Sequence, residues 1–304
     1  MIYTCTLNPS IDYIVKTNDF KIGGLNRAEQ TQFFPGGKGI NVSRVLKRLD
    51  AQSIALGFAG GFTGDFVKDF LTGESIEHDF LEVQDLTRIN VKLKASEETE
   101  INGQGPEITE ENQSALLQKI NGLQSGDMLV IAGSIPSSMS SDFYTKITRL
   151  CKETGIHTVI DTSGPALRET FSDRPFLIKP NHHELGELFD TDIKDADEVV
   201  FYAKKLLEEG VQNVIVSMAG EGAIFLNDEY TLFADVPKGK VKNSVGAGDS
   251  VVAGFIASYI KERDIEDAFR TGVAAGSATA FSDDLCTKEE VEKLKQFVRI
   301  KKTG

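Results

Sequence analysis

Short apolar segments that each end in small polar residues recur through the second half of the chain. Their length and composition are those of buried strands. The segments and their endings are 128–132 before Gly133-Ser134, 158–161 before Thr162-Ser163, and 176–178 before Lys179-Pro180-Asn181. In a parallel sheet the carboxyl ends of the strands lie on one rim, where ligands usually bind. This alternation predicts an α/β fold with a doubly wound, mostly parallel sheet and a binding site along that rim.

The length and charge of the chain narrow its class. A chain of 304 residues can form one large α/β domain. The net charge of −13 argues against nucleic acid or an anionic membrane surface as the main partner, although a local cluster of Lys and Arg suffices for a small anion. The three cysteines show no disulfide or zinc spacing. Residues 1–7 read as a strand rather than a signal peptide, and no apolar run is long enough to span a membrane, so we expect a cytoplasmic protein.

Residues 243–250, Asn-Ser-Val-Gly-Ala-Gly-Asp-Ser, form a glycine-rich turn in front of a helical stretch, 247–260. Gly246 and Gly248 permit a tight turn, so the N–H groups of 246–249 can converge at the start of a helix, which favours phosphate. Asp249 places a carboxylate at the edge of this turn, where it could accept a proton from an attacking hydroxyl. Taken alone, the motif is more typical of a plain turn in which Asp249 only caps the helix.

A second glycine-rich loop, 35–41, leads into a helical stretch at 42–49. It lacks the GxxxxGK[ST] pattern of a P-loop, and no complete GxGxxG follows a strand, which argues against a dinucleotide-binding fold. Its glycines would let a ligand approach the backbone, while Lys38 can reach an anion and Asn41 offers both a donor and an acceptor. A plain turn remains the alternative.

Two stretches depart from the alternation of strands and helices. Residues 11–34 contain short β-like pieces, and residues 85–102 alternate polar and apolar side chains before a hairpin partner. They predict a small β-sheet that forms a lid. Arg88 is suited to clamp a phosphate if the lid covers a site, and Asp12 could accept hydrogen bonds from sugar hydroxyls; otherwise both are strand residues that face water.

Asn181-His182-His183-Glu184 opens another helix. The spacing of Asn181 and Glu184 fits a capping box, and the alternative is an outer-shell site for the Mg²⁺ of a nucleotide, because Mg²⁺ usually keeps waters between itself and protein oxygens. The adjacent histidines point in different directions on a helix and do not indicate a metal site. Helical periodicity continues through 267–280 and 288–298.

Together these stretches resemble the ribokinase-like sugar kinases, in the phosphofructokinase B branch. The resemblance runs through nearly the whole chain, and GGKGxN and GAGDS are specific as a pair. The matching segments, in order, are 6–12, 36–41, 133–136, 179–181 and 245–250. One conservative departure is Ile135, where the family often has Leu.

The resemblance implies a single ribokinase-like α/β domain over 1–304, with a discontinuous lid from about 11–34 and 85–102. It implies ATP carrying Mg²⁺ as the phosphoryl donor, a small phosphosugar as the acceptor, and a homodimer that forms through the lid. Residues 87–92 look more like the members that phosphorylate fructose 1-phosphate than those that act on tagatose 6-phosphate. Kinases of tagatose 6-phosphate or fructose 6-phosphate, and a non-catalytic sugar-phosphate sensor on the same fold, remain the alternatives.

The resemblance also assigns roles to residues. Asp249 is the expected general base, kept ionised by the helix dipole, and the N–H groups of Gly246, Ala247 and Gly248 stabilise the transferring phosphoryl group. The expected substrate-binding residues are Asp12, Arg27, Gly36, Gly37, Lys38, Asn41, Arg88 and Ser134. The expected nucleotide-binding residues are Lys179, Asn181, Glu184, Ser217, Gly220, Gly222, Ser244 and Gly276. No residue is expected to bind metal directly, because Mg²⁺ arrives with ATP and Glu184 acts from the outer shell.

Overall fold

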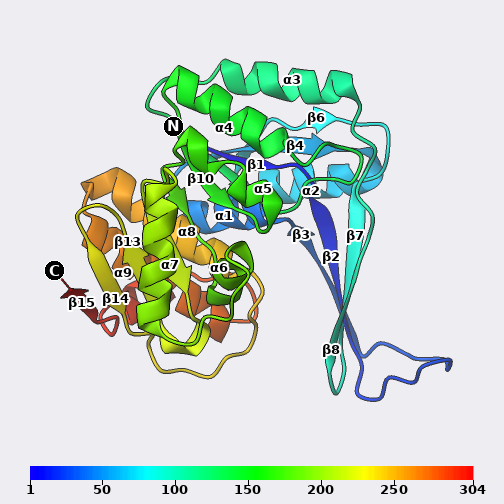
Figure 1. The fold of residues 1–304 in the computed structure, drawn as a ribbon. Helices are drawn as coiled ribbons and strands as arrows, with labels where there is room; N and C mark the ends of the chain where they lie inside the picture. The colour runs from blue at the N-terminus through cyan, green and yellow to red at the C-terminus, as the bar shows by residue number, and fades with distance from the viewer. Residues whose placement is uncertain (304) are drawn as a thin grey trace.

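An 11-stranded sheet forms the centre of the computed structural model, which describes residues 1–303 (Figure 1). The strand order is β15-β14-β13-β12-β11-β10-β9-β1-β4-β5, and β6 also pairs with β4. The strands are β1 (Ile2–Thr6), β4 (Ile54–Ala59), β5 (Glu77–His78), β6 (Leu81–Glu82), β9 (Met128–Ala132), β10 (His157–Asp161), β11 (Leu177–Ile178), β12 (Val214–Ser217), β13 (Ala223–Leu226), β14 (Thr231–Ala234) and β15 (Ile300–Thr303). The sheet is parallel up to β12, and β13 to β15 are antiparallel, so the predicted mostly parallel sheet is confirmed.

Side chains that alternate along the strands bury both faces of the sheet. In β9, Val130 joins a core with α1, α8 and α9, whereas its neighbours Leu129 and Ile131 join a core with α3 and α4. One layer contains α1 (Lys38–Arg48), α8 (Ala247–Glu262), α9 (Ile265–Phe281) and α10 (Lys288–Lys295). The other contains α3 (Glu110–Asn121), α4 (Phe143–Thr154), α5 (Pro165–Arg168), α6 (His182–Leu188) and α7 (Ala196–Glu208). This doubly wound arrangement confirms the predicted fold class.

The order of the strands reverses beside β1. From β1 the sheet extends through β4 on one side, and the chain then returns to place β9 on the other side. Such a reversal opens a crevice at the carboxyl ends of the strands, which is the usual ligand site in open α/β sheets.

Four strands form a separate sheet that projects from the body (Figure 1). Their order is β3 (Gln30–Gly36), β2 (Ser10–Lys16), β7 (Arg88–Lys94) and β8 (Glu98–Asn102). The register places Asp12 beside Asn90 and Ile14 beside Lys92, so the polar residues of β7 and Asp12 share one face. Helix α2 (Gly61–Gly73) packs between this sheet and β4. Its strands overlap segments 11–34 and 85–102, from which the sequence predicts a lid. We call this sheet the lid.

Three features in the C-terminal part of the chain differ from the prediction. The helix expected over 288–298 ends at Lys295, and the chain then forms β15 as an edge strand. Strand β15 reads Ile-Lys-Lys-Thr and is largely exposed, so it lacks the apolar alternation by which a strand is predicted. Strand β14 was not predicted either.

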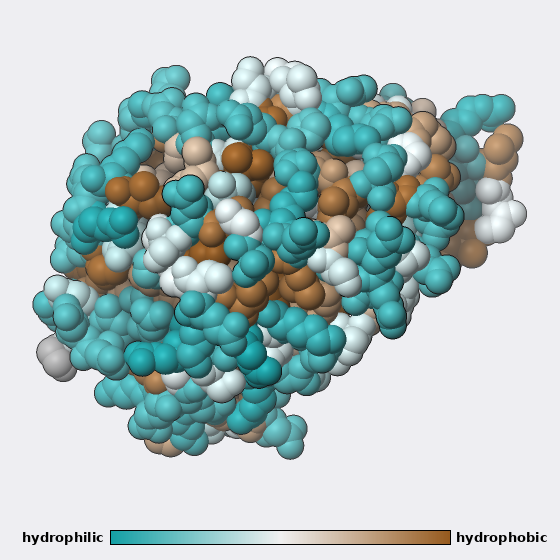
Figure 2. Space-filling view, turned by 90° about the horizontal axis from the view of Figure 1, so that it is seen from above, coloured by the Kyte–Doolittle hydropathy of each residue, from teal (hydrophilic) through white to brown (hydrophobic). Residues whose placement is uncertain are grey.

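The surface seen from above is mainly hydrophilic, with apolar side chains in its recesses and at the end where the lid projects (Figure 2). Within residues 1–303, the structure contains no helix that is both long and apolar enough to cross a membrane.

Candidate active site

A cleft of about 840 Å³ lies at the carboxyl ends of β1, β9 and β10, beneath the lid. Its volume is in the range of sites for small molecules and cofactors. Many predicted site residues from distant parts of the chain line it. They are Asp12, Gly37, Lys38, Asn41, Arg88, Ser134, Lys179, Asn181, Glu184, Ser217, Ser244, Gly246, Gly248 and Asp249.

Six predicted site residues are not among the residues that line this cleft: Arg27, Gly36, Gly220, Gly222, Ala247 and Gly276. Arg27 is exposed in the loop between β2 and β3. Gly36 lies against Asp12 and Ser10, where a Cβ atom would overlap their side-chain oxygens. Gly276 packs α9 against the start of α8, beside Ala247 and Val251.

The glycine-rich turn before α8 presents a helix N-terminus to the cleft. Gly246 is the N-cap residue in the left-handed region, with φ of 77°, and the helix has no hydrogen bond from a capping side chain within the described residues. The Ala247 N–H donates to the Ser244 carbonyl at 3.3 Å. The Asp249 side chain contacts Asn41 instead of its own backbone. The interpretation of Asp249 as a simple cap is therefore wrong, and the turn leaves backbone donors available for an anion.

Asp249 is buried and held by α1. The Asn41 side chain donates a hydrogen bond from Nδ2 to Oδ2 of Asp249 at 2.8 Å. Burial, followed by the negative charge of Asp161, raises the pKa of Asp249 to about 6. The expectation based on the helix dipole alone misses these two effects. A carboxylate with a pKa slightly below neutral is well placed to act as a general base.

Asp161, at the end of β10, is a site residue that the sequence analysis missed. It is 1% exposed and binds Lys38 Nζ at 3.0 Å and Lys179 Nζ at 3.6 Å. Burial favours a higher pKa for Asp161, but the charges of Lys179 and Lys38 outweigh it and lower the pKa. The charge of Asp161 in turn raises the pKa of Lys38, despite burial. Its place at the end of a predicted strand was the signal that could have found it.

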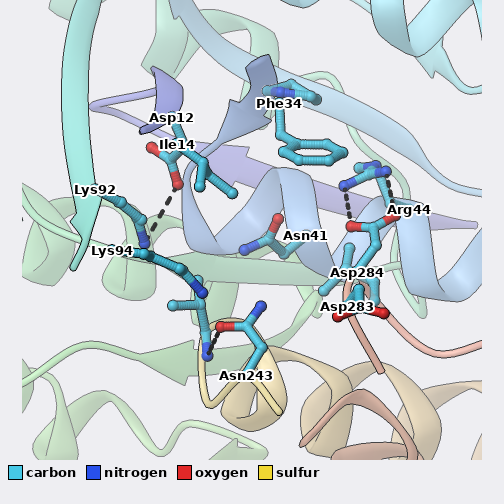
Figure 3. A pocket seen from close by; sticks show the side chains of 13 residues that line it. Asp12, Ile14, Phe34, Asn41, Arg44, Lys92, Lys94, Asn243, Asp283 and Asp284 are labelled. Carbon is cyan, nitrogen blue, oxygen red and sulfur yellow. Dashed lines mark hydrogen bonds and ion pairs between the residues drawn. The ribbon is translucent and has the colours of Figure 1, made fainter. Parts of the chain in front are cut away.

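The lid also contributes charged side chains to the cleft. Asp12 accepts hydrogen bonds from Ser10 at 2.8 Å and Asn90 at 3.1 Å, and its other oxygen lies 3.6 Å from Lys92 Nζ (Figure 3). Lys92 also lines the cleft and was not predicted as a site residue. Because side chains repeat every two residues along a strand, its position four residues after Arg88 places it on the same face of β7.

Arg88 reaches the base of the lid. Its guanidinium donates to the carbonyl oxygens of Gly103 at 3.3 Å and Asn8 at 3.2 Å. Its Nε atom is buried without a hydrogen-bond partner in residues 1–303. Burial lowers the pKa of Arg88, which remains a cation at neutral pH. An unpaired donor on a partly buried cation fits an anionic ligand.

Asn181 and Glu184 form the predicted capping box at the start of α6. Asn181 Oδ1 accepts from the Glu184 N–H, and Glu184 Oε2 accepts from the Asn181 N–H, both at 2.8 Å. Both side chains still line the cleft. The structural role is thus present, and it holds two oxygen-bearing side chains at the rim beside Lys179.

Residues 5–291 match the pfkB family of carbohydrate kinases. The chain belongs to this family. It is therefore related to enzymes that transfer a phosphoryl group to a carbohydrate hydroxyl, and the glycine-rich turns, the lid and the cleft lie within the matched range.

Individual relatives cover nearly all of this pfkB-family kinase. It is 56% identical to a 1-phosphofructokinase of Bacillus subtilis, with 99% of each chain covered. It is 38% identical to a D-tagatose-1-phosphate kinase of Bacillus licheniformis, with 97% of each covered. The structure of phosphofructokinase-2 from Escherichia coli in complex with fructose-6-phosphate superposes with a TM-score of 0.91 at 30% identity, covering 97% of this chain and 98% of that one.

Proposed function

We propose that this kinase transfers the γ-phosphoryl group of ATP to the 6-hydroxyl of fructose 1-phosphate and produces fructose 1,6-bisphosphate. The observation that carries the proposal is the buried Asp249 beside an uncapped helix N-terminus, in one cleft with Lys38, Arg88 and Lys179. The choice of sugar is supported by the 56% identical relative that is a 1-phosphofructokinase.

Asp249 acts as the general base. Its carboxylate accepts the proton of the 6-hydroxyl as that oxygen attacks the γ-phosphorus in line with the leaving ADP oxygen. Asn41 holds the carboxylate in place at 2.8 Å. Backbone N–H groups of Gly246, Ala247 and Gly248 stabilise the transferring phosphoryl group, whose transition state mainly requires positioning and electrostatic stabilisation. For Ala247 this requires its N–H to exchange the 3.3 Å bond to Ser244 for the phosphoryl oxygen.

The sugar phosphate binds between the lid and α1. Asp12, Gly37 and Asn41 hold its hydroxyl groups, while Lys38, Arg88 and Ser134 bind its phosphate, with the unpaired Nε of Arg88 as one donor. In this proposal the contacts with the phosphate fix the orientation of the sugar, and thereby which of its oxygens faces Asp249.

The nucleotide lies along the rim from Lys179 to Ser217, and the oxygen donors there fit Mg²⁺. Among residues 1–303 the buried Asp161 Oδ2 accepts no hydrogen bond and has the Lys179 ammonium 3.6 Å away, and Glu184 and Asn181 lie along the same cleft. Within residues 1–303, no three Asp, Glu, His or Cys side chains lie close enough together to hold a metal ion by themselves. This suits Mg²⁺ that keeps phosphate oxygens and waters as most of its ligands. When bound, Mg²⁺ neutralises charge on the transferring phosphates.

The activity is expected to fall at acidic pH. Asp249 accepts a proton only as a carboxylate, and burial together with Asp161 places its pKa at about 6. Above this pH the base is ionised, and below it kcat/KM should fall about tenfold per pH unit. Initial rates from pH 5 to 8 at saturating Mg²⁺ test this. An acid limb that is flat down to pH 5 would contradict the assignment of the base.

A substrate panel tests the proposed function itself. ADP release is measured with ATP and fructose 1-phosphate, fructose 6-phosphate, tagatose 6-phosphate or unphosphorylated sugars. The highest kcat/KM is expected with fructose 1-phosphate. A preference for a 6-phosphate would support the alternative kinases, and no ADP release with any sugar would support a non-catalytic sensor.

The lid carries an apolar row on the face opposite Asp12, which we propose as the interface of a homodimer. The row has one residue from each of the four strands, in the order Phe33, Tyr13, Val91 and Ile101. Phe33 is 50% and Ile101 62% exposed, and contiguous apolar surface of this kind marks an interaction site. In a dimer with two-fold symmetry, this row on one copy would pack against the same row on the second copy.

The expected mass by sedimentation equilibrium is that of two chains, and Ile101→Lys should shift it to one chain because it places a charge in the apolar contact. Phe297→Lys is the matched control, since Phe297 is also 62% exposed but lies near the C-terminus. A dimer that persists in Ile101→Lys would argue against the lid as the interface.

A further inference from the structure

Two arginines one helical turn apart on α1 bind the same pair of carboxylates. The Arg44 side chain is 2% exposed, and its Nε and Nη2 lie 2.8 and 2.9 Å from Glu74. Its Nη1 and Nη2 lie 3.3 and 3.1 Å from Asp284 (Figure 3). Arg48 joins the same acids, at 3.4 Å from Glu74 and 2.7 Å from Asp284. Forked contacts of this kind fix orientation as well as distance.

The cluster links three separate parts of the chain. Glu74 is the residue that ends α2, and Asp284 lies in the segment between α9 and α10. Arg48 also donates to the carbonyl oxygens of Leu285 and Cys286. In this network Arg44 is buried but Asp284 is 36% exposed. Such a network is weak evidence for a gain in stability, because exposed ion pairs contribute little and buried ones are often matched by apolar replacements of similar volume. We therefore consider which parts of the structure the network holds in position.

Segment 284–286 supports the turn before α8. Leu285 fills the space beside Gly246, where a Cβ atom would overlap its Cδ2. The Cys286 N–H donates to Thr279 Oγ1 at 3.0 Å, and Thr279 Oγ1 lies 2.7 Å from Ser250 Oγ. Ser250 Oγ then donates to the Gly246 carbonyl at 2.8 Å. One apolar contact and one buried chain of hydrogen bonds thus connect this segment to the turn.

Helix α1 therefore reaches the turn by two routes. At its N-terminal end, Asn41 binds Asp249 directly. Further along, the two arginines reach the turn through Asp284 and segment 284–286. We propose that Arg44 and Arg48 are positioning residues for phosphoryl transfer, which hold the Gly246–Asp249 turn at a fixed place relative to Lys38 and Asn41. The inference rests on the proposed role of that turn.

The experiment replaces the shared carboxylate with its neutral isostere, Asp284→Asn. We expect kcat to fall about 10- to 100-fold, because small displacements of reacting groups have effects of this size, while both KM values stay within about twofold. In hydrogen exchange, the peptide that covers residues 244–252 should exchange faster than in the wild type. The second measurement does not depend on catalysis.

Asp267→Asn is the matched control. Asp267 binds Lys295 at 2.7 Å and Ser258 at 2.8 Å, on the first turn of α9 and away from the residues that line the cleft. Its kcat and the exchange of residues 244–252 should match the wild type. Two further variants test Arg48 itself. Arg48→Met removes both the charge and the forked contacts, whereas Arg48→Lys keeps the charge. The kcat of Arg48→Lys should therefore lie between those of the wild type and Arg48→Met.

Three results would overturn the inference: an unchanged kcat in Asp284→Asn, an equal loss in Asp267→Asn, or a loss confined to the KM of the sugar. If Asp249→Asn kept its turnover, the assigned base would fail, and the exchange data would still decide whether the arginines hold the turn. If another phosphosugar proved to be the substrate, the same comparison of variants would be made with that sugar.

Discussion

Asp249→Asn is expected to lower kcat by roughly 10²- to 10⁴-fold, with the dissociation constants of ATP and the sugar phosphate changed little. The amide has nearly the same size as the carboxylate and fits the same buried position, 2.8 Å from Asn41. It does not accept a proton, however, so the hydroxyl has to attack without a base. Steady-state rates give kcat, and calorimetric titration gives the two dissociation constants.

Asp173→Asn is a suitable control for this substitution. Asp173 is also a buried acid, 7% exposed, with Lys152 and Arg149 each at 3.6 Å. It lies in the 3₁₀ helix Phe171–Asp173, among residues that do not line the cleft. The control should keep wild-type kcat. Wild-type turnover in Asp249→Asn would exclude Asp249 as the base.

Arg88→Ala is expected to raise KM for the sugar phosphate about 10- to 100-fold, and KM for ATP by much less. Hydrogen bonds to a charged group are typically worth about 1.5 to 3 kcal/mol, which corresponds to this range. The unpaired Nε of Arg88 is the donor that the substitution removes. The measurement is the pair of KM values, each determined with the other substrate saturating.

Two further variants separate the charge of Arg88 from its shape. Arg88→Lys keeps the charge without the fork, so it should recover part of the affinity for the sugar phosphate. Arg270→Ala removes an arginine that pairs with Glu266 at 2.7 Å on α9, and both KM values should stay unchanged. Equal increases in both KM values of Arg88→Ala would argue against a specific contact with the sugar phosphate.

The parts of the site that could be predicted are those with local signals. Gly246 and Gly37 have positive φ values, and each precedes a helix. Glycines in front of a helical pattern are therefore enough to indicate a turn that leads into a helix. Asn41 and Lys38 follow from the same loop. The order of strands and glycine-rich turns then identifies the rim on which these elements meet.

The parts that could not be predicted depend on pairs of residues far apart in the chain. The position of Asp161 at the end of a predicted strand could mark it as a candidate, but its role comes from Lys38 and Lys179, which the sheet brings beside it. The raised pKa of Asp249 likewise needs burial and a neighbouring charge that the turn itself does not contain. The contacts of Arg44 with Glu74 and Asp284 had no signal in the helical pattern of α1 beyond a polar residue on its buried side.

The way in which the lid is built has a consequence for folding. Its two central strands, β2 and β7, are parallel neighbours, yet residues 17–87 lie between them, including β4 and α2 of the body. Parallel strands cannot be joined by a tight hairpin, and bringing such distant segments together carries a loop-closure entropy that local contacts do not offset. The lid is therefore not expected to form an independent folding unit, and its central pair is expected to assemble only on a body in which β4 and α2 are already in place.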